Sequence, residues 1–324
     1  MERIVRIKYC DFPKVDEKHF FITRALKKFC NPVISDDPEI LFYSCYSGEH
    51  LKYKNVVKVF FSGENVHPDF NECDYAIACQ PIVYGNRFFQ LAGHNWHMDA
   101  TANDRARIQL QQKTRFCNFI YSNGNLLHEG VRKRIEFCKL LSAYKRVDCP
   151  GRVLHNMDAP ELSSRSSNEW ALSKTKFIQQ YKFTIAWENT FGEGYTTEKL
   201  AEPLMAGSVP IYWGYVPSYI NPKSIINVSD FTNMSDLVKY VEYLDNNDEA
   251  YCEMLLSQPL LPSYRFHWED ELSLFLKQIV DSNFAQRVKA PVGYDSASIV
   301  LRSMHNRSNL LLRTLRFCKR ALRF

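Results

Sequence analysis

The sequence lacks the long apolar runs and the compositional bias of membrane-spanning, fibrous or disordered proteins. It has no window of about 20 apolar residues and no N-terminal apolar stretch of about 7–15 residues ending in small residues, so neither a transmembrane helix nor a secretory signal peptide is expected. Its 12 glycines and 14 prolines in 324 residues are too few for a collagen-like or low-complexity chain. We therefore expect a globular, cytoplasmic protein.

Cysteine is present, but not in a pattern that indicates a metal or redox site. The ten cysteines contain no C-x-x-C pair, which disfavours zinc binding and thiol redox motifs. In a cytoplasmic protein, such cysteines are expected to be reduced and buried.

Net positive charge is confined to the C-terminal end of the sequence. The formal net charge is +5, but residues 285–324 hold nine basic residues and one acidic residue, a balance of +8. The first 284 residues therefore carry −3. Residues 1–284, with a net charge close to zero, would attract the phosphate backbone of a nucleic acid only weakly, so we expect no nucleic-acid partner.

The length allows two domains, since domains usually have about 100–200 residues. Up to residue 112, short apolar runs alternate with polar stretches of helical pattern, and a second alternating series follows. Strands separated by about 10–15 residues of helical pattern are typical of βαβ units and parallel sheets. We predict two α/β domains, 1–112 and 113–284, that form a cleft, followed by a tail, 285–324.

The stretch Phe183–Gly214 predicts an anion-binding site. Its pattern indicates a strand, a glycine-bearing loop, a helix capped by Thr196 or Thr197, and a second strand after Gly207. In an open α/β sheet, loop amides and a helix N-terminus beyond the strand ends face bound anions. Lys199 adds a full charge to that terminus, so a diphosphate would suit it.

Two further features of this stretch qualify the prediction. Pro203 lies about six residues into the helix, so we expect the helix to be short or bent. The alternative to an anion site is a plain βαβ unit in which Glu198 and Lys199 form an exposed pair.

As a whole, the stretch resembles the donor-binding signature of glycosyltransferase family 10, the α1,3/4-fucosyltransferases, of the bacterial type. That signature reads approximately E-N-x5-Y-x-T-E-K, followed by a strand of the form G-x-(V/I)-P-(I/V)-x-x-G. The matching residues are Glu188, Asn189, Tyr195, Thr197, Glu198, Lys199, Gly207, Val209, Pro210, Ile211 and Gly214.

Two other segments are similar to the family. Residues Phe60–Ala78 match the F-x-G-E-N-x-x-P-x-F-x-x-x-D-Y-A segment of its acceptor-side domain, and a turn after the apolar run 56–61 would deliver Glu64 at the end of a strand. Arg134, three residues before Phe137, matches an arginine near the start of a helix in the donor domain. The alternative for Arg134 is a solvated basic helix face.

The resemblance implies a GT-B fold, with two Rossmann-like domains facing across a cleft, to which the tail pattern described below adds a basic amphipathic C-terminal helix. Residues 1–112 would bind the acceptor and residues 113–284 would bind GDP-fucose. It also implies inverting transfer of L-fucose from GDP-β-L-fucose to a hydroxyl of an acceptor. An inverting displacement needs one general base and no covalent nucleophile.

Roles for single residues follow from the same resemblance. Glu64 would be the base, whereas Arg134 and Lys199 would neutralise charge on the departing GDP. Glu198 would hold sugar or ribose hydroxyls, or face the oxocarbenium-like centre. Asn189 and Tyr195 would lie around the nucleotide and fucose, and Tyr195 could equally belong to the core.

No required metal and no cofactor are expected. Many sugar-nucleotide enzymes hold a divalent ion with a D-x-D carboxylate pair, and this sequence has no D-x-D triplet. Stimulation by a non-essential divalent cation is compatible with this. His94, His97 and Asp99 have a spacing that could suit metal ligands, but packing or lining of the acceptor cleft is the favoured interpretation.

The tail predicts an amphipathic helix. From Ser308 onwards, apolar residues fall on one helical stripe and arginines on the opposite face. Such a helix is typical of attachment to anionic lipid, so we expect a cytoplasmic protein that is peripheral on the inner membrane. The alternative is a helix that packs on the body of the protein or on another chain.

The acceptor is the least determined part of the function. The resemblance favours an N-acetylglucosamine-containing glycan, with a Lewis x-type product on lipopolysaccharide O-antigen. Two alternatives stay open: an inverting GT-B transferase for another sugar nucleotide, and a non-catalytic, membrane-associated glycan-binding adaptor.

Overall fold

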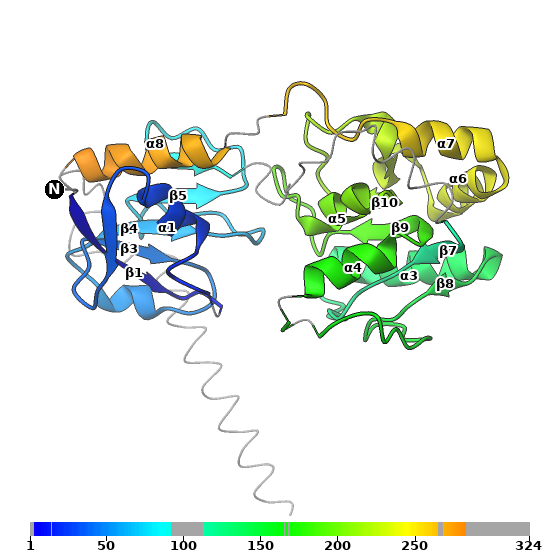
Figure 1. The fold of residues 1–324 in the computed structure, drawn as a ribbon, viewed down its shortest axis with the longest axis horizontal. Coiled ribbons are helices and arrows are strands. Elements are labelled where there is room, and N and C mark those ends of the chain that lie inside the picture. Colours follow the sequence, from blue (N-terminus) through cyan, green and yellow to red (C-terminus); the bar gives the residue numbers. More distant parts are fainter. Residues whose placement is uncertain are drawn as a thin grey trace, which may run out of the picture.

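The computed structural model shows two α/β domains, each built on a parallel sheet (Figure 1). The two α/β domains predicted from the alternating apolar runs are therefore confirmed. The residues that the structure describes are 3–13, 15–91, 113–164, 166–167, 169–264 and 268–282.

The first domain contains a six-stranded parallel sheet in the order β2-β1-β3-β4-β5-β6. A short helix, α1 (Phe21–Leu26), connects β1 to β2, and a 3-10 turn, η1 (Glu49–Lys52), follows β3. The strands are β1 (Ile4–Cys10), β2 (Asn31–Ile34), β3 (Ile40–Tyr43), β4 (Val57–Phe61), β5 (Tyr75–Ala78) and β6 (Phe88–Gln90).

Helix α8 (Trp268–Asp281) packs on the first domain, beside α1, although it follows the second domain in the sequence (Figure 1). Its buried face, which includes Leu272 and Leu276, joins the core beneath the first sheet. An ion pair of 2.6 Å between Lys28 and Asp270 reinforces this contact. The range 113–284, suggested by the sequence for the second domain, thus includes a helix that belongs to the first.

The second domain contains a five-stranded parallel sheet in the order β11-β10-β9-β7-β8. Its strands are β7 (Arg115–Asn118), β8 (Val147–Asp148), β9 (Tyr181–Trp187), β10 (Val209–Trp213) and β11 (Ile226–Asn227). Its helices are α3 (Glu129–Tyr144), α4 (Trp170–Ile178), α5 (Glu198–Ala206), α6 (Met234–Asn246) and α7 (Asp248–Leu256), with 3-10 turns η3 (Pro222–Ser224) and η4 (Val228–Asp230).

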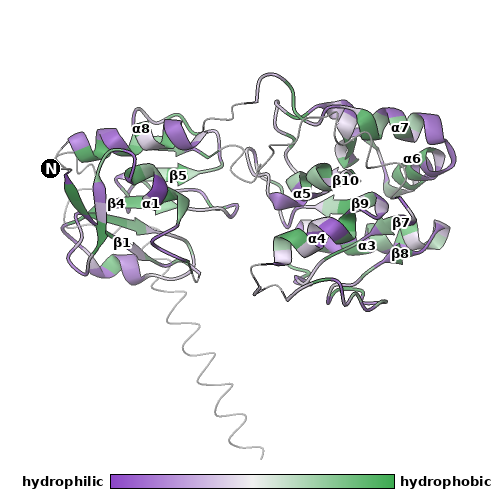
Figure 2. Cartoon of the chain, viewed as in Figure 1, coloured by the Kyte–Doolittle hydropathy of each residue, from purple (hydrophilic) through white to green (hydrophobic). Residues whose placement is uncertain are grey.

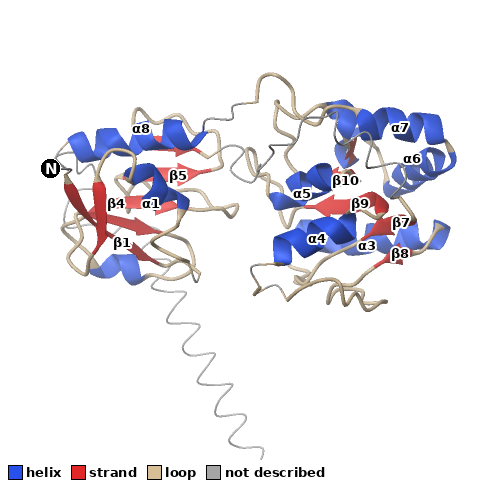
Figure 3. Cartoon of the chain, in the orientation of Figure 1, coloured by secondary structure: helices blue, strands red, loops and turns tan. Residues whose placement is uncertain are grey.

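The second sheet is buried on both faces, as expected where helices cover a parallel sheet (Figures 2 and 3). Strand β9 lies between β7 and β10, and five successive residue pairs join it to β10, from Phe183 opposite Val209 to Trp187 opposite Trp213. The strand order reverses between β7 and β9. Ligands of open α/β sheets bind at such a reversal, outside the carboxyl ends of the strands.

Some of the predictions concern residues that the structure does not describe. His94, His97 and Asp99, and the amphipathic helix of the tail, lie outside the described residues. Among the helices that are described, none has the length and apolar character needed to cross a membrane.

Candidate active site

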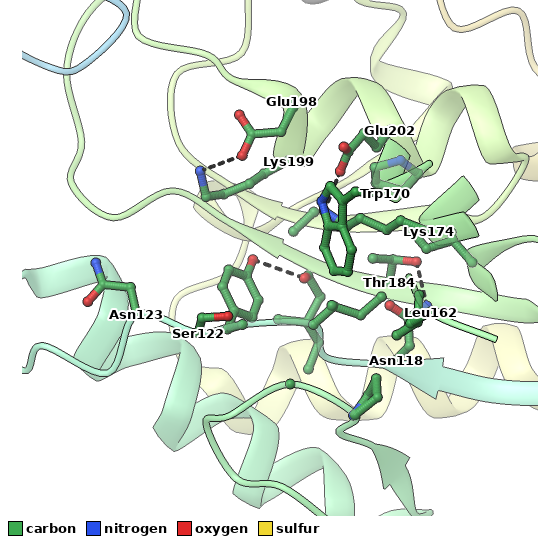
Figure 4. Close-up of a pocket in the computed structure, with 18 of the residues that line it drawn as sticks. Asn118, Ser122, Asn123, Leu162, Trp170, Lys174, Thr184, Glu198, Lys199 and Glu202 are labelled. Atoms are coloured by element: carbon green, nitrogen blue, oxygen red, sulfur yellow. Dashed lines mark hydrogen bonds and ion pairs between the residues drawn. The ribbon is translucent and has the colours of Figure 1, made fainter. Parts of the chain in front are cut away.

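A cavity of about 490 Å³ opens where the strand order of the second sheet reverses, beyond the carboxyl ends of β7 and β9. Loops after these strands and helices α3, α4 and α5 form most of its wall, and the first domain contributes Glu64. Figure 4 shows the side chains of α4 and α5 on one side and the segment after β7 on the other. The polar lining includes Glu64, Asn118, Ser122, Asn123, Arg134, Arg152, Lys174, Asn189, Glu198, Lys199 and Glu202.

The N-terminus of α5 is held by a buried carboxylate. Glu188, which directly follows β9 and is fully buried, accepts hydrogen bonds from the backbone N–H of Thr197 at 2.8 Å and from its hydroxyl at 2.8 and 2.9 Å. Thr197 is the N-cap of α5, and its Oγ1 accepts from the Lys199 backbone N–H. The predicted cap is therefore confirmed at Thr197. Through Glu188 and Thr197, hydrogen bonds join the end of β9 to the start of α5 as one unit.

Lys199 projects from the first turn of α5 into this unit. Its Nζ lies 3.2 Å from Glu188 Oε2 and 3.3 Å from Glu198 Oε1, and it donates to Thr197 Oγ1 at 3.0 Å. Burial alone would lower the pKa of the Lys199 ammonium, but the Glu188 and Glu198 carboxylates raise it above its ordinary value. Lys199 is therefore a fixed positive charge at a helix N-terminus, where the helix dipole also favours an anion.

Helix α5 is short, as Pro203 led us to expect. It has nine residues, with Pro203 inside it, and it ends at Gly207, whose φ of 69° lies in the left-handed region. Proline supplies no N–H for the helical hydrogen bond, and glycine takes the left-handed conformation without the cost of a Cβ. The helix therefore begins and ends where the sequence indicates.

Arg134, on α3, is fully buried beneath the cavity and stacks on the Tyr121 ring, with its guanidinium carbon 3.8 Å from the ring centroid. Its Nη1 donates to Trp187 O at 3.2 Å and to Asn189 Oδ1 at 2.9 Å, and its Nη2 donates to Asn123 O at 2.7 Å. Burial lowers the pKa of this guanidinium, although arginine stays charged in proteins.

One donor of this buried guanidinium is unused. Within the described part of the chain, Arg134 Nε has no hydrogen-bond partner. A buried donor without a partner costs free energy unless an acceptor reaches it. The Nε–H and one Nη2–H lie along the same edge of a guanidinium, the edge that binds two oxygens of one anion.

Glu64 follows β4 after a two-residue turn, as the sequence predicts, and lines the cavity from the first domain. Its Oε1 accepts from the Tyr46 hydroxyl at 3.2 Å, and its Oε2 accepts from the Tyr195 hydroxyl at 3.4 Å. The backbone N–H of Glu64 also donates to Ser62 Oγ at 3.0 Å. Two phenols, one from each domain, thus bracket this carboxylate.

The structure brings most of the predicted residues together. Glu64, Arg134, Asn189, Glu198 and Lys199 all line the same cavity. Tyr195 is buried, with 2% of its surface exposed, and reaches the site through its hydrogen bond to Glu64. Its burial raises the pKa of the Tyr195 phenol, so the hydroxyl keeps the proton that it donates.

Several residues of the cavity are not among those predicted from the sequence. Ser122 and Asn123 follow β7, so the strand-end argument that identified Glu188 could have found them. Lys174 and Glu202 pair with each other across α4 and α5 inside the cavity (Figure 4), and 28 positions separate them. No local signal marks such a pair.

The chemistry of the lining suits a polar, anionic ligand. The cavity lining holds four basic side chains (Arg134, Arg152, Lys174 and Lys199) and three carboxylates (Glu64, Glu198 and Glu202). Among the residues that the structure describes, no group of three or more histidine, cysteine or acidic side chains is arranged to hold a metal ion. The prediction that no metal is required stays a prediction.

Comparison with known proteins agrees with this geometry. The family model for glycosyltransferase family 10 (fucosyltransferase), C-terminal part, matches residues 110–272, half of the chain. A model for the N-terminal domain of α-(1,3)-fucosyltransferase FucT matches residues 7–96. The chain belongs to glycosyltransferase family 10. The site described above lies within the two matched ranges.

Curated fucosyltransferases are similar to this chain over part of their length. The α-(1,3)-fucosyltransferase FucT of Helicobacter pylori is 30% identical over 237 residues, which are 65% of this chain and 48% of that protein. GDP-fucose protein O-fucosyltransferase 3 of Gallus gallus is 40% identical over 122 residues, which are 36% of this chain and 26% of that protein. The chain thus spans half or less of the length of these curated relatives.

Solved structures share the fold. A crystal structure of α1,3-fucosyltransferase has a TM-score of 0.69 at 24% identity, and one with GDP has a TM-score of 0.68 at 23% identity. Each comparison covers 86% of this chain and 91% of the solved chain. The predicted GT-B arrangement of two Rossmann-like domains is confirmed for this family-10 chain.

Proposed function

We propose that this protein is an inverting α1,3-fucosyltransferase that uses GDP-β-L-fucose as its donor. The observation that carries the proposal is a single cavity lined by two cationic groups of the second domain, Lys199 and Arg134, and by a carboxylate of the first domain, Glu64. Family membership and the geometry of the cations support the donor. The inversion rests on the chemistry described below, and the acceptor rests on similarity to known fucosyltransferases.

Lys199 and Arg134 are the proposed diphosphate-binding groups. Lys199 adds a full charge to the helix terminus of α5, and the unused Nε of Arg134 supplies a buried donor. Charge that develops on the departing GDP would be stabilised by groups that are already oriented, which is usually the largest contribution to catalysis.

Glu198 is the proposed exchangeable partner of Lys199. Its side chain is half exposed, whereas the other partner, Glu188, is fully buried. A phosphate oxygen could therefore replace the Glu198 carboxylate at Lys199 Nζ while Glu188 continues to hold the ammonium. The displaced carboxylate would then be available to sugar or ribose hydroxyls.

Glu64 is the proposed general base. The acceptor oxygen would form a bond to the anomeric carbon of fucose, the bond from that carbon to the β-phosphate oxygen of GDP would break, and Glu64 would take the acceptor proton. One displacement inverts the anomeric centre and leaves no covalent intermediate on the protein. Such base catalysis is worth about 10²–10⁴ in rate.

The proposed acceptor is an N-acetylglucosamine-containing glycan that would give a Lewis x-type product, as on lipopolysaccharide. Similarity to the α-(1,3)-fucosyltransferase FucT of Helicobacter pylori supports the α1,3 linkage, and the glycan itself is proposed from the resemblance of the sequence to the family. A second candidate is a hydroxyl of a protein side chain. The 40% identity to a GDP-fucose protein O-fucosyltransferase over 122 residues favours it.

The test of this function compares donors before acceptors. Calorimetry with GDP, UDP and CMP should show selective binding of GDP. Transfer from GDP-fucose, GDP-mannose and UDP-galactose is then measured with N-acetyllactosamine and with a mixture of folded protein acceptors, and the product linkage is read by NMR. An α-linked fucose on N-acetylglucosamine supports the proposal, whereas preference for a UDP-sugar contradicts it.

We also propose that the basic tail attaches the protein to anionic membrane. The charge balance of +8 in residues 285–324 and the helical alternation of apolar and basic residues support this. Removing residues 305–324 should abolish sedimentation with vesicles that contain phosphatidylglycerol. Unchanged sedimentation would refute the membrane role of the tail.

A further inference from the structure

A polar contact joins the two domains directly beside Glu64. The side-chain amide of the next residue, Asn65, donates to Thr190 Oγ1 at 3.1 Å and to Phe191 O at 3.0 Å. A carbonyl oxygen can only accept, so the amide nitrogen must face Phe191. Both amide hydrogens of Asn65, in the first domain, are thus donated to the loop that follows β9 in the second domain.

Two glycines allow this loop to approach the first domain so closely. A Cβ on Gly192 would lie 2.2 Å from Asn65 Oδ1, and a Cβ on Gly194 would lie 2.1 Å from the carbonyl oxygen of Cys79. Gly194 also has a φ of 79°, which disfavours any side chain. The loop therefore lies directly on the first domain: a side chain at position 194 would collide with backbone, and one at position 192 would displace the Asn65 amide.

The two ends of the loop reach the two halves of the site. At its start, Asn189 Oδ1 accepts a hydrogen bond from Arg134 Nη1 at 2.9 Å. At its end, the Tyr195 hydroxyl donates to Glu64 Oε2 at 3.4 Å. The loop is thus a short physical link between the proposed diphosphate-binding arginine and the proposed base.

We propose that Asn65 is a positioning residue that couples the nucleotide site of the second domain to the orientation of Glu64 in the first. The inference rests on the proposed function. A nucleotide that orders Arg134 and Asn189 also orders the loop, and Asn65 transmits this order to the backbone that carries Glu64. Without the Asn65 amide, the Glu64 carboxylate can still accept a proton, but it is no longer held in a defined position relative to GDP-fucose.

The backbone around Glu64 offers a direct readout of this coupling. The N–H groups of Ser62 and Val66 donate to Ile77 O and Glu64 O, at 3.2 and 2.7 Å. Hydrogen exchange of the segment 60–66 therefore reports how firmly this backbone is held. In the wild-type protein, GDP alone should slow exchange in this segment.

The main variant is Asn65→Ala, and Asn71→Ala is the matched control. Asn71 is an exposed asparagine of the same domain, and among the described residues its side chain donates only to Asp69, within its own turn. Asn65→Ala should bind GDP within about twofold of the wild-type affinity but lose the GDP-dependent slowing of exchange. Its kcat should fall at least about tenfold with little change in the donor KM, as expected for the loss of the two neutral hydrogen bonds to the loop.

A second variant breaks the hydrogen bond between Asn65 and Thr190 from the side of the second domain and leaves Asn65 unchanged. Thr190→Val keeps the shape of Thr190 but removes the hydroxyl that accepts from Asn65. It should therefore lower kcat and reduce the GDP-dependent slowing of exchange, each by less than Asn65→Ala does. Combined with Asn65→Ala, it should add almost nothing, because both changes break the same contact.

The outcomes separate this inference from the proposed function. If wild-type protein and Asn65→Ala bind GDP, and if GDP slows exchange in 60–66 equally in both or kcat is unchanged, the coupling is refuted while the proposed function stands. If wild-type protein does not bind GDP, the proposed function fails and this inference fails with it.

Discussion

Replacing Glu64 with glutamine removes the proposed base and leaves the shape of the site almost unchanged. The glutamine oxygen can still accept from one of the two phenols that bracket the carboxylate, Tyr46 or Tyr195. Glu64 is only partly buried, so the fold does not depend on its charge. The expected loss is therefore chemical rather than structural.

The size of the loss follows from what a general base contributes. A rate factor of about 10²–10⁴ corresponds to about 2.7–5.4 kcal/mol in the activation free energy. We expect Glu64→Gln to lower kcat at least about 100-fold in an assay that measures GDP release at saturating donor and acceptor. The affinity for GDP, measured by calorimetry, should change by less than about threefold because the base faces the sugar rather than the nucleotide.

A control variant at an exposed glutamate, and a minimum expected loss of kcat, allow this prediction to be refuted. Glu193 is an exposed glutamate in the loop between β9 and α5, and Glu193→Gln should retain nearly the full rate. A loss of less than about tenfold in Glu64→Gln would show that Glu64 does not act as the base. It would favour a non-catalytic role for this fold or a different proton acceptor.

Three further predictions concern charge, pH and metal. Lys199→Gln leaves buried Glu188 without its cation, so the free energy of unfolding in urea should fall by about 3–5 kcal/mol. Adding Glu188→Gln should restore most of that stability but not GDP binding, which should stay at least about tenfold weaker; wild-type affinity in the double variant would contradict the role of Lys199. In the first domain, the buried ring of His50, in η1, lies between the carboxylates of Asp11 and Glu72, with Nε2 3.1 Å from Glu72. Burial alone would lower the pKa of His50, but the two carboxylates raise it above its ordinary value. The protonated histidine therefore stabilises the fold fully below about pH 6.5, and this contribution is lost as pH rises through the raised pKa. The difference in unfolding free energy between wild-type protein and His50→Gln should shrink over that range, and a difference independent of pH would refute the assignment. Transfer should continue in excess EDTA, and a loss of activity that Mg²⁺ or Mn²⁺ restores would overturn the predicted metal independence.

Local and periodic signals explain which features could be predicted from the sequence. The parallel strands, the cap at Thr197, the end of α5 at Gly207 and the place of Glu64 after β4 each depend on a few neighbouring residues. Such features are encoded by hydrophobic period, capping and turn chemistry. The resemblance to the family added the association of these segments into one site.

Long-range pairing explains what could not be predicted. The pattern of α8 indicates a buried face but not which sheet covers it, and the structure pairs it with α1, more than 240 positions away. Lys174 with Glu202, and Asn65 with Thr190, likewise meet only because the fold brings distant segments together. Side-chain contacts of this kind leave no periodic trace in the sequence.

A crystal structure of the protein with GDP tests the central claim most directly. We expect diphosphate oxygens within hydrogen-bond distance of Lys199 Nζ and Arg134 Nε, with the Glu64 carboxylate facing the end of the diphosphate where fucose would be attached. A diphosphate bound away from both cations, or a Glu64 side chain turned out of the cavity, would contradict it.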